Sequence, residues 1–376
     1  MKTVALELQP CLGNRSGIGT YAWELSRRLQ DDAELHFCGA AYNFLGRRNR
    51  SAELDGIRMP VIEGRILPYW AYRRIWNIIP IPYNWVIPTK ADLHVFFNYI
   101  VPPHIKGKVL TTVCDMTWLR FPETMAAGNR RRLTDGLERS VRAADRIITI
   151  SEFSKREITD LLSVPADRVA VVPCAARCSD ALVPFKAIAE KYGVRQPFLL
   201  YVGTLEPRKN LIRLLHAFER LKKQEQLPHQ LVLAGGKGWN NEAFDTALAA
   251  SPVKDAVILT GFISEAEKNS LYQHADLFVF PSLYEGFGIP PLEAMHWGCP
   301  VVAADAASLP EVCGDAAVLV DPTEEERIAS GIRRVLADPA FADALREKGR
   351  QQEMKYSWDR SALLLHNLCR EVLYET

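Results

Sequence analysis

Residues 280–300 read FPSLYEGFGIPPLEAMHWGCP, and the interpretation of the chain starts from this stretch. Glu285 and Glu293 flank a Gly-Phe-Gly turn and the pair Pro290–Pro291. Because proline is tolerated in the first helical turn, Glu285 is expected in a loop and Glu293 near a helix N-terminus. Glycine amides, a helix N-terminus and a carboxylate that accepts two hydroxyl hydrogen bonds favour a polyhydroxylated, anionic ligand. A turn followed by a capped helix with solvated glutamates is the alternative, and the stretch alone leaves it open.

The composition predicts a two-domain globular protein. With 376 residues the chain is too long for one core of ordinary size. A hydrophobic content of 48% with 24% charged residues is typical of a soluble protein, and the net charge of +1 gives no reason to expect a nucleic-acid partner. No apolar run of about 18 residues predicts a transmembrane helix.

A cytoplasmic location is expected from two further observations. A strand is predicted at residues 4–8, directly after the start, so no signal peptide is expected. The eight cysteines form no CxxC pair, and the spacing of Cys174 and Cys178 is unusual for zinc. Free thiols in a reducing compartment are therefore expected.

Short apolar runs alternate with helical patterns along the first half of the chain. Strands are predicted at residues 4–8, 34–38, 56–61, 91–97, 109–113, 146–150 and 169–172. A basic amphipathic helix is predicted at residues 130–144, and Ser151 is expected to cap the next helix. Such alternation predicts a parallel, doubly wound sheet.

The same alternation begins again after residues 173–184, where Pro, Cys, Ala and Ser indicate a hinge. Strands are predicted at 198–202, 230–234, 256–259 and 276–280, with a helix at 211–221. The expected fold is α/β, with two Rossmann-like doubly wound domains facing a central cleft, where a substrate usually binds. The predicted domains are 1–178 and 186–356, with a C-terminal helix at 357–376 packing back on the first domain.

Candidate ligand-binding residues in the first half follow two predicted strands. Gly17 and Gly19 lie in a strand-to-helix loop, where a ligand meets the carboxyl edge of a parallel sheet. The loop does not match GxGxxG, so a nicotinamide site is weakly supported. Asp115 follows the strand at 109–113 and is predicted either to orient or deprotonate an acceptor hydroxyl or to cap a loop; both interpretations stay open.

In the second half, four strands are predicted to end in loops suited to a nucleotide. Arg208 and Lys209 precede a helix N-terminus, and charge plus helix dipole would bind a pyrophosphate. Gly235–Gly236 and Gly261–Phe262 end the next two strands, and the loop of Glu285 ends the fourth. This coincidence favours a nucleotide site over four unrelated turns.

The segment at residues 66–88, ILPYWAYRRIWNIIPIPYNWVIP, has two interpretations. Pro68, Pro80, Pro82 and Pro88 exclude one long helix. A short core helix with a packed loop is one interpretation. The other is a surface for the acceptor or for an anionic membrane, with aromatic side chains at the interface and arginines toward lipid phosphate.

Several of these segments resemble the retaining glycosyltransferases of family 4, which have the GT-B fold. In the second half the matching segments are YVGTLEPRKN, LVLAGG, TGF and FPSLYEGFGIPPLEAMHWGCPVVAAD; SGIGTYAWEL and RAADRIITISEFSKREI fit in the first half. The most similar subgroup adds mannose or a related sugar to bacterial surface polysaccharides, commonly from a GDP-linked donor. The resemblance implies a hexosyltransferase acting on a lipid-linked or polysaccharide acceptor in O-antigen or capsule synthesis, in the cytoplasm or at the inner membrane face.

The resemblance also implies that the domain at 1–178 binds the acceptor and the domain at 186–356 binds the nucleotide-sugar donor, and it implies roles for single residues. Arg208 and Lys209 match the pair that holds the donor diphosphate. Glu293 matches the glutamate that binds the ribose, and Glu285 the one near the transferred sugar. The remaining positions assigned to the nucleotide sugar or to the loop facing its diphosphate are Gly17, Gly19, Gly203, Phe262, Gly286, Phe287 and Gly288.

One departure concerns Cys114-Asp115, where many relatives carry His-Asp. The cysteine keeps a backbone carbonyl for contact near the anomeric carbon, but any side-chain role of the histidine is lost. No DxD-type pair follows a predicted strand, so neither a metal nor a cofactor beyond the nucleotide-sugar co-substrate is expected. Retention without an obvious nucleophile fits front-face attack, with Glu285 as a covalent nucleophile the less favoured variant.

Three rival functions remain open at this point. A sugar-nucleotide epimerase and a phosphorylase share the two-domain arrangement, although no pyridoxal lysine can be argued for the latter. A non-catalytic subunit that keeps the fold and binds sugars is the third, and the presence of Arg208, Lys209, Glu285 and Glu293 argues against it.

Overall fold

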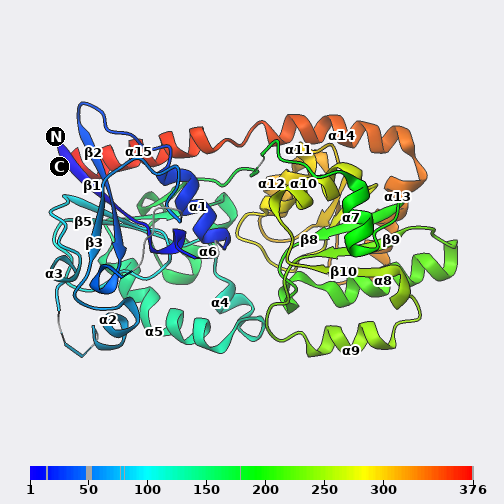
Figure 1. Ribbon diagram of the computed structural model, residues 1–376, viewed down its shortest axis with the longest axis horizontal. Helices are drawn as coiled ribbons and strands as arrows, with labels where there is room; N and C mark the ends of the chain where they lie inside the picture. The colour runs from blue at the N-terminus through cyan, green and yellow to red at the C-terminus, as the bar shows by residue number, and fades with distance from the viewer. Residues whose placement is uncertain (14–15, 48–52, 77, 80, 178, 375–376) are drawn as a thin grey trace. The chain divides into compact units, whose positions relative to one another are not determined.

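The chain folds into two compact units in a computed structural model that describes residues 1–13, 16–47, 53–76, 78–79, 81–177 and 179–374 (Figure 1). Unit 1 consists of Met1–Met116, Gly128–Cys174 and Ser357–Thr376. Unit 2 consists of Thr117–Ala127 and Ala175–Tyr356. Cys178, Pro80 and most of the arginine-rich loop around residue 49, on which sequence-based expectations also rest, lie outside the described residues.

Unit 1 is built on a seven-stranded sheet in which every pair is parallel, with the order β3-β2-β1-β4-β5-β6-β7. The strands are β1 (Lys2–Glu7), β2 (Leu35–Tyr42), β3 (Val61–Gly64), β4 (Leu93–Phe96), β5 (Lys108–Thr112), β6 (Arg146–Thr149) and β7 (Val169–Val171). The strand order reverses between β1 and β4. In doubly wound sheets ligands bind outside the carboxyl ends of strands at such a switch point.

The strand predicted at residues 56–61 was wrong. Strand β3 begins only at Val61, and the preceding residues form turns. Gly56 has a φ of 83°, which does not fit a strand, and Pro60 has no N–H to donate to the ladder. The apolar pattern therefore placed the start of the strand five residues too early.

The helices of unit 1 include the predicted C-terminal one. They are α1 (Gly17–Ser26), α2 (Tyr69–Ile75), α3 (Tyr83–Val86), α5 (Ala127–Ala143), α6 (Glu152–Leu162) and α15 (Trp358–Tyr374). Helix α15, red in Figure 1, packs against α1. The Ser361 hydroxyl donates to the Pro173 carbonyl at 2.8 Å, and His366 Nε2 lies 2.9 Å from Asp32 Oδ2. These contacts tie the end of the chain to unit 1.

Unit 2 is built on a six-stranded parallel sheet with the order β10-β9-β8-β11-β12-β13. The strands are β8 (Phe198–Val202), β9 (Gln230–Ala234), β10 (Val257–Gly261), β11 (Leu277–Phe280), β12 (Val301–Ala304) and β13 (Val318–Val320). The first two have their predicted bounds, and the last two were not predicted. Strands β8, β11 and β12 are buried along their whole length, as expected for a sheet covered on both faces.

The helices of unit 2 form two sets of contacts, which meet where α13 (Glu325–Ala337) contacts α14 (Pro339–Glu353) (Figure 1). In one set α8 (Leu211–Glu225) contacts α9 (Glu242–Ala250) and α13. In the other, α10 (Glu265–His274) contacts α7 (Phe185–Tyr192) and α11 (Ile289–His296), while α12 (Leu309–Cys313) and α14 contact α11. Two parallel α/β units of this kind are the predicted fold class.

A short segment from the first half of the sequence belongs to unit 2. It contains the helix α4 (Thr117–Arg120) and a 3-10 turn at Pro122–Thr124. The Trp239 Nε1–H donates to the Thr124 carbonyl at 2.6 Å, and the rings of Phe121 and Tyr284 lie 5.5 Å apart. The predicted division at residue 178 does not contain this excursion of the chain, because its partners come from distant parts of the sequence.

Candidate donor site at the sheet edge of unit 2

Glycines end three neighbouring strands at one edge of the unit 2 sheet, as the sequence predicted. Gly203, Gly235 and Gly261 end β8, β9 and β10. The Gly235 N–H donates to the Gly261 carbonyl at 3.1 Å, and Gly203 N–H to the Ala234 carbonyl at 2.9 Å. A Cβ built on Gly235 would lie 1.9 Å from the Gly203 carbonyl oxygen, so the backbones approach too closely for any side chain there.

Arg208 and Lys209 lie in a 3-10 turn, Pro207–Lys209, between β8 and α8. Lys209 Nζ lies 2.5 Å from Glu285 Oε1, and Arg208 Nη1 lies 2.9 Å from Glu285 Oε2. Arg208 Nη2 lies 2.6 Å from Oε1 of Glu206, and Nη1 also donates to the Tyr284 carbonyl. The structure therefore brings three predicted residues together and adds Glu206, which the sequence analysis did not single out.

This cluster, defined by Glu206, Arg208, Lys209 and Glu285, contains two buried carboxylates and two cations. Burial by itself would raise the pKa of Glu285, but the charges of Arg208 and Lys209 outweigh it and lower that pKa to about 2. Glu285 is thus an anion at neutral pH, and both of its oxygens contact cations. The cluster as a whole is neutral without a ligand, so an incoming dianionic group would compete with two carboxylates for the same N–H donors.

The Gly-Phe-Gly turn after Glu285 is held by Ser308. The Ser308 hydroxyl lies 2.9 Å from the Glu285 carbonyl and 2.7 Å from the Phe287 carbonyl. Gly288 has a φ of 109° and precedes α11 as its N-cap, with prolines in the first turn, as predicted. Phe287 is buried, with its ring edge-to-face against Tyr356. The turn is therefore fixed from inside unit 2, with Gly286 buried between Glu285 and Phe287.

Replacing Ser308 by alanine is expected to loosen this turn. Two buried carbonyls lose a hydroxyl partner, which should lower the free energy of unfolding by about 1–3 kcal/mol. Chemical denaturation and donor KM measure the effect, and donor KM should rise because Glu285 and the turn move together. Ser330→Ala is the control, since that exposed hydroxyl bonds only within its own helix. An unchanged denaturation midpoint for Ser308→Ala would contradict the role of Ser308.

Glu293 lies in α11 and is buried against two residues of α10. Its Oε1 lies 2.6 Å from Lys268 Nζ, and its Oε2 accepts a hydrogen bond from the Tyr272 hydroxyl at 3.2 Å. Lys268 and Tyr272 are four residues apart, so they share one helix face. The capping box of Ser264 and Glu267 lets the sequence indicate the start of α10 just before Lys268, although it does not indicate the contacts with Glu293. The contacts of Glu293 with α10 do not test its predicted ribose role, which stays a prediction.

The remaining predicted donor residues differ in accessibility. The Phe262 ring, directly after β10, is 85% exposed, which suits contact with a flat ligand surface. Gly17 is exposed and Gly19 is buried in the first turn of α1, where Ser16 Oγ accepts the Gly19 N–H at 3.4 Å. Gly203 has a φ of 154°, and a Cβ there would lie 2.7 Å from the Tyr201 hydroxyl. All four roles stay predictions.

In unit 1, Cys114 and Asp115 follow β5 as predicted. Burial raises the pKa of the Cys114 thiol, which therefore stays neutral at physiological pH. The Cys114 carbonyl accepts a hydrogen bond from the Ser154 hydroxyl at 3.0 Å, so this carbonyl has a fixed direction. Asp115 is half-buried and lies near the Tyr99 hydroxyl. Burial and the charge of Asp115 raise the pKa of that hydroxyl.

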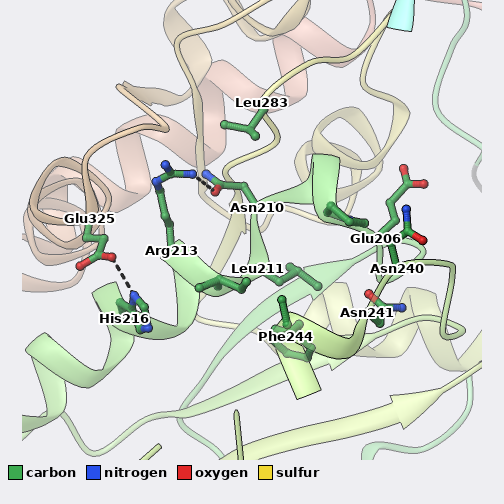
Figure 2. Close-up of a pocket in the computed structure, with 13 residues that line it drawn as sticks. Glu206, Asn210, Leu211, Arg213, His216, Asn240, Asn241, Phe244, Leu283 and Glu325 are labelled. Carbon is green, nitrogen blue, oxygen red and sulfur yellow. Dashed lines mark hydrogen bonds and ion pairs between the residues drawn. The ribbon is translucent and has the colours of Figure 1, made fainter. Parts of the chain in front are cut away.

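A cavity of about 380 Å³ lies beside the turn of Arg208 (Figure 2). Its polar lining includes the pair His216 and Glu325, 2.7 Å apart, and Arg213, whose Nη1 lies 2.9 Å from Asn210 Oδ1. Of the cluster residues only Glu206 lines it, and no predicted donor residue does. The residues predicted to bind the donor at the sheet edge therefore lie outside the lining of this cavity.

Within the described ranges, no three His, Cys, Asp or Glu side chains gather so as to hold a metal ion. Over the same residues, none of the helices combines the length and apolar character that crossing a bilayer requires. Metal independence stays a prediction.

Solved structures with a similar fold cover the whole chain. Sucrose-phosphate synthase from Thermosynechococcus elongatus superposes with a TM-score of 0.73 at 19% identity, covering 100% of both chains. HepE from Anabaena, in complex with UDP and glucose, has a TM-score of 0.73 at 16% identity, covering 99% of this chain and 100% of that one. The two parallel-sheet units thus have the GT-B fold.

Sequence comparisons agree with the fold. Residues 185–352 match the family described as glycosyl transferases group 1, and residues 15–179 match glycosyltransferase family 4. The O-antigen chain mannosyltransferase B of Escherichia coli is 30% identical over 359 residues, covering 92% of this chain and 93% of that protein. The chain therefore belongs to the GT-B glycosyltransferases of family 4.

Proposed function

We propose that the protein is a retaining, metal-independent hexosyltransferase that moves mannose or a related sugar from a GDP-linked donor to a lipid-linked or polysaccharide acceptor in surface-glycan synthesis. The observation that carries the proposal is the buried cluster of Glu206, Arg208, Lys209 and Glu285 at the sheet edge of unit 2. The similarity to an O-antigen mannosyltransferase supports the sugar and the pathway class.

The cluster fits the departure of a nucleoside diphosphate. As the bond between the anomeric carbon and the diphosphate oxygen breaks, negative charge develops on the diphosphate and positive charge on the sugar. Arg208 and Lys209 donate to the leaving group and stabilise its charge, usually the largest single contribution to such catalysis. Because Glu206 and Glu285 already hold Arg208 and Lys209 in this turn, the donor diphosphate replaces carboxylate contacts of side chains that are ordered before it binds.

Retention is assigned to front-face attack. The acceptor oxygen bonds to the anomeric carbon on the side that the diphosphate leaves, and the acceptor proton passes to the departing phosphate oxygen. Glu285 is poorly placed as a nucleophile because each of its oxygens contacts a cation, which lowers its basicity. Its charge instead holds Arg208 and Lys209 in place.

The donor is tested by direct comparison. The purified protein is incubated with GDP-mannose or UDP-glucose and a mannose-terminated acceptor, and the anomeric configuration of the product is determined by proton NMR. Transfer from GDP-mannose with an α product, unaffected by EDTA, is expected. A β product would exclude retention, conversion of the donor to an epimer without acceptor would favour an epimerase, and donor binding without any transfer would favour a non-catalytic subunit.

A membrane-surface role is proposed for the segment 66–88. Trp70 and Trp85 are 66% and 68% exposed, and Ile78 is 80% exposed, so part of this segment does not pack in the core. Arg74 is also exposed near Trp70 in α2. Exposed aromatic side chains next to arginine suit the interface of an anionic bilayer.

Liposome flotation tests this role. The protein is expected to float with vesicles containing 30 mol% phosphatidylglycerol and to remain at the bottom with phosphatidylcholine alone. The double variant Trp70→Ser/Trp85→Ser should reduce flotation, whereas Trp239→Ser in unit 2 should not. Absence of flotation on anionic vesicles would remove the membrane proposal and leave the transferase proposal untouched.

A further inference from the structure

Glu7 occupies the switch point of the unit 1 sheet and joins its two central strands. It is the last residue of β1, and its Oε2 accepts the Phe97 N–H, directly after β4, at 3.1 Å. The switch point is where a doubly wound sheet binds its ligand. Glu7 keeps part of its surface accessible, so a ligand at this edge can reach it.

The turn that follows β4 is strained at the same place. Tyr99 has a φ of 59°, an unusual left-handed conformation for a large side chain. It is held there by its N–H, which donates to the Thr112 carbonyl at 2.9 Å, and by its carbonyl, which accepts from Thr111 Oγ1 at 3.2 Å. Strain of this type clusters at ligand sites. Its consequence here is to present Asn98 at the sheet edge.

Arg132 of α5 brings a positive charge to this edge. Its Nη2 donates to Asn98 Oδ1 at 3.1 Å, while its buried Nε has no hydrogen-bond partner within the described chain. Burial raises the pKa of Glu7 to about 7, and the Phe97 N–H and Arg132 only partly counteract it. The surrounding protein therefore does not fully balance the Glu7 carboxylate or the Arg132 guanidinium with charges and hydrogen bonds.

Tyr42, the last residue of β2, adds a buried hydroxyl. It is 4% exposed, and its hydroxyl has no partner among the residues that the structure describes. Its ring lies 5.0 Å from that of Tyr69 in α2, and the Glu7 charge contributes to raising its pKa, which places it near that carboxylate. A buried hydroxyl without a hydrogen-bond partner destabilises the folded protein, so its presence requires an explanation.

These groups match the chemistry of a sugar. A carboxylate accepts from a pair of vicinal hydroxyls, a guanidinium and a phenol donate to ring or hydroxyl oxygens, and a tyrosine ring such as Tyr69 packs against the apolar C–H face. We propose that Glu7, Arg132 and Tyr42 form a subsite in unit 1 that binds the terminal sugar of the glycan acceptor through its hydroxyls. This inference rests on the proposed glycosyl transfer and assigns its acceptor.

The test uses the full-length protein and α-linked mannobiose, the probe that the similarity to mannosyltransferases indicates. Saturation-transfer NMR without donor reports binding of the disaccharide, and steady-state kinetics with GDP-mannose reports both KM values. Glu7→Gln, Arg132→Met and Tyr42→Phe are each expected to raise the mannobiose KM at least tenfold and to weaken saturation transfer. Donor KM and acceptor-free hydrolysis of the donor should change by less than twofold.

Tyr42→Phe is the decisive variant because a structural role and a ligand-binding role of the hydroxyl predict different mannobiose binding. If the hydroxyl only fills space, its removal leaves stability equal or higher and mannobiose binding unchanged. If it binds the acceptor, stability is equal or higher while mannobiose binding falls. An unchanged mannobiose KM in Tyr42→Phe, or no saturation transfer to mannobiose from the unmodified protein, would overturn the subsite.

Matched controls separate the subsite from general damage to unit 1. Asp92→Asn removes a carboxylate that, like Glu7, accepts a backbone N–H; it accepts the Thr3 N–H near the amino end of β1 and also binds Lys2. Arg131→Met removes the exposed neighbour of Arg132 on α5. Both should leave the mannobiose KM unchanged. Mannobiose binding without transfer from any donor would refute the proposed function and keep the subsite, whereas transfer unaffected by the three variants would do the reverse.

Discussion

Lys209→Met is expected to reduce kcat by about 1,000-fold, because the leaving diphosphate loses a buried cationic partner. Methionine retains the stem beside the Phe280 ring, over which the ammonium now lies at 5.3 Å. The free energy of unfolding should fall by about 2 kcal/mol, since Glu285 keeps Arg208 but loses its contact with Lys209. Rapid-quench or coupled assays measure kcat, and chemical denaturation measures the stability.

The control for this variant is Lys348→Met, which breaks an exposed ion pair with Asp315 in unit 2. It should change neither kcat nor stability measurably. Arg208→Met should resemble Lys209→Met in kcat but lose more stability, because it also leaves Glu206 without its cation. Full activity in Lys209→Met or Arg208→Met would refute the assignment of the diphosphate to these cations.

Gly235→Ala is expected to have the largest effect on stability, lowering the free energy of unfolding of unit 2 by about 3 kcal/mol or more. The new Cβ would lie 1.9 Å from the Gly203 carbonyl oxygen, and the φ of 154° disfavours any side chain. Backbone atoms of β8 and β9 must then separate at the edge that carries the donor residues. Donor affinity should therefore fall along with the denaturation midpoint.

Gly236→Ala offers a control one residue away. No atom within 4 Å would meet its Cβ, and its φ is not in the left-handed region. Its stability should match that of the unmodified protein. Equal stability of the two variants would contradict the close backbone approach inferred at Gly235.

Whether a strand was predicted depended on its length and on the residues that flank it. Strands β8 and β9 have the predicted bounds because β8 is a five-residue apolar run between Pro197 and Gly203, and β9 contains the apolar run 231–234 followed by Gly235. Strands β12 and β13 have only four and three residues. Short apolar runs do not distinguish a strand from a buried helix segment, so these two were missed.

The candidate site was predictable in its parts and not in its pairing. Residue types and positions at strand ends pointed to Arg208, Lys209 and Glu285, and the resemblance assigned their roles. Ser308 and Lys268 were missed, because each acts through a partner more than twenty residues away, Ser308 on Glu285 and Lys268 on Glu293. No local pattern encodes such a pair.

The stretch at 280–300 shows where the boundary lies. The sequence alone determined that a glycine turn and a proline-started helix follow an apolar strand, since these are local backbone preferences. Only the tertiary structure decided that Glu285 faces two cations and that Glu293 faces Lys268 and Tyr272. The physical reason is that charge pairing depends on distance in space, which the packing of strands and helices sets after local structure has formed.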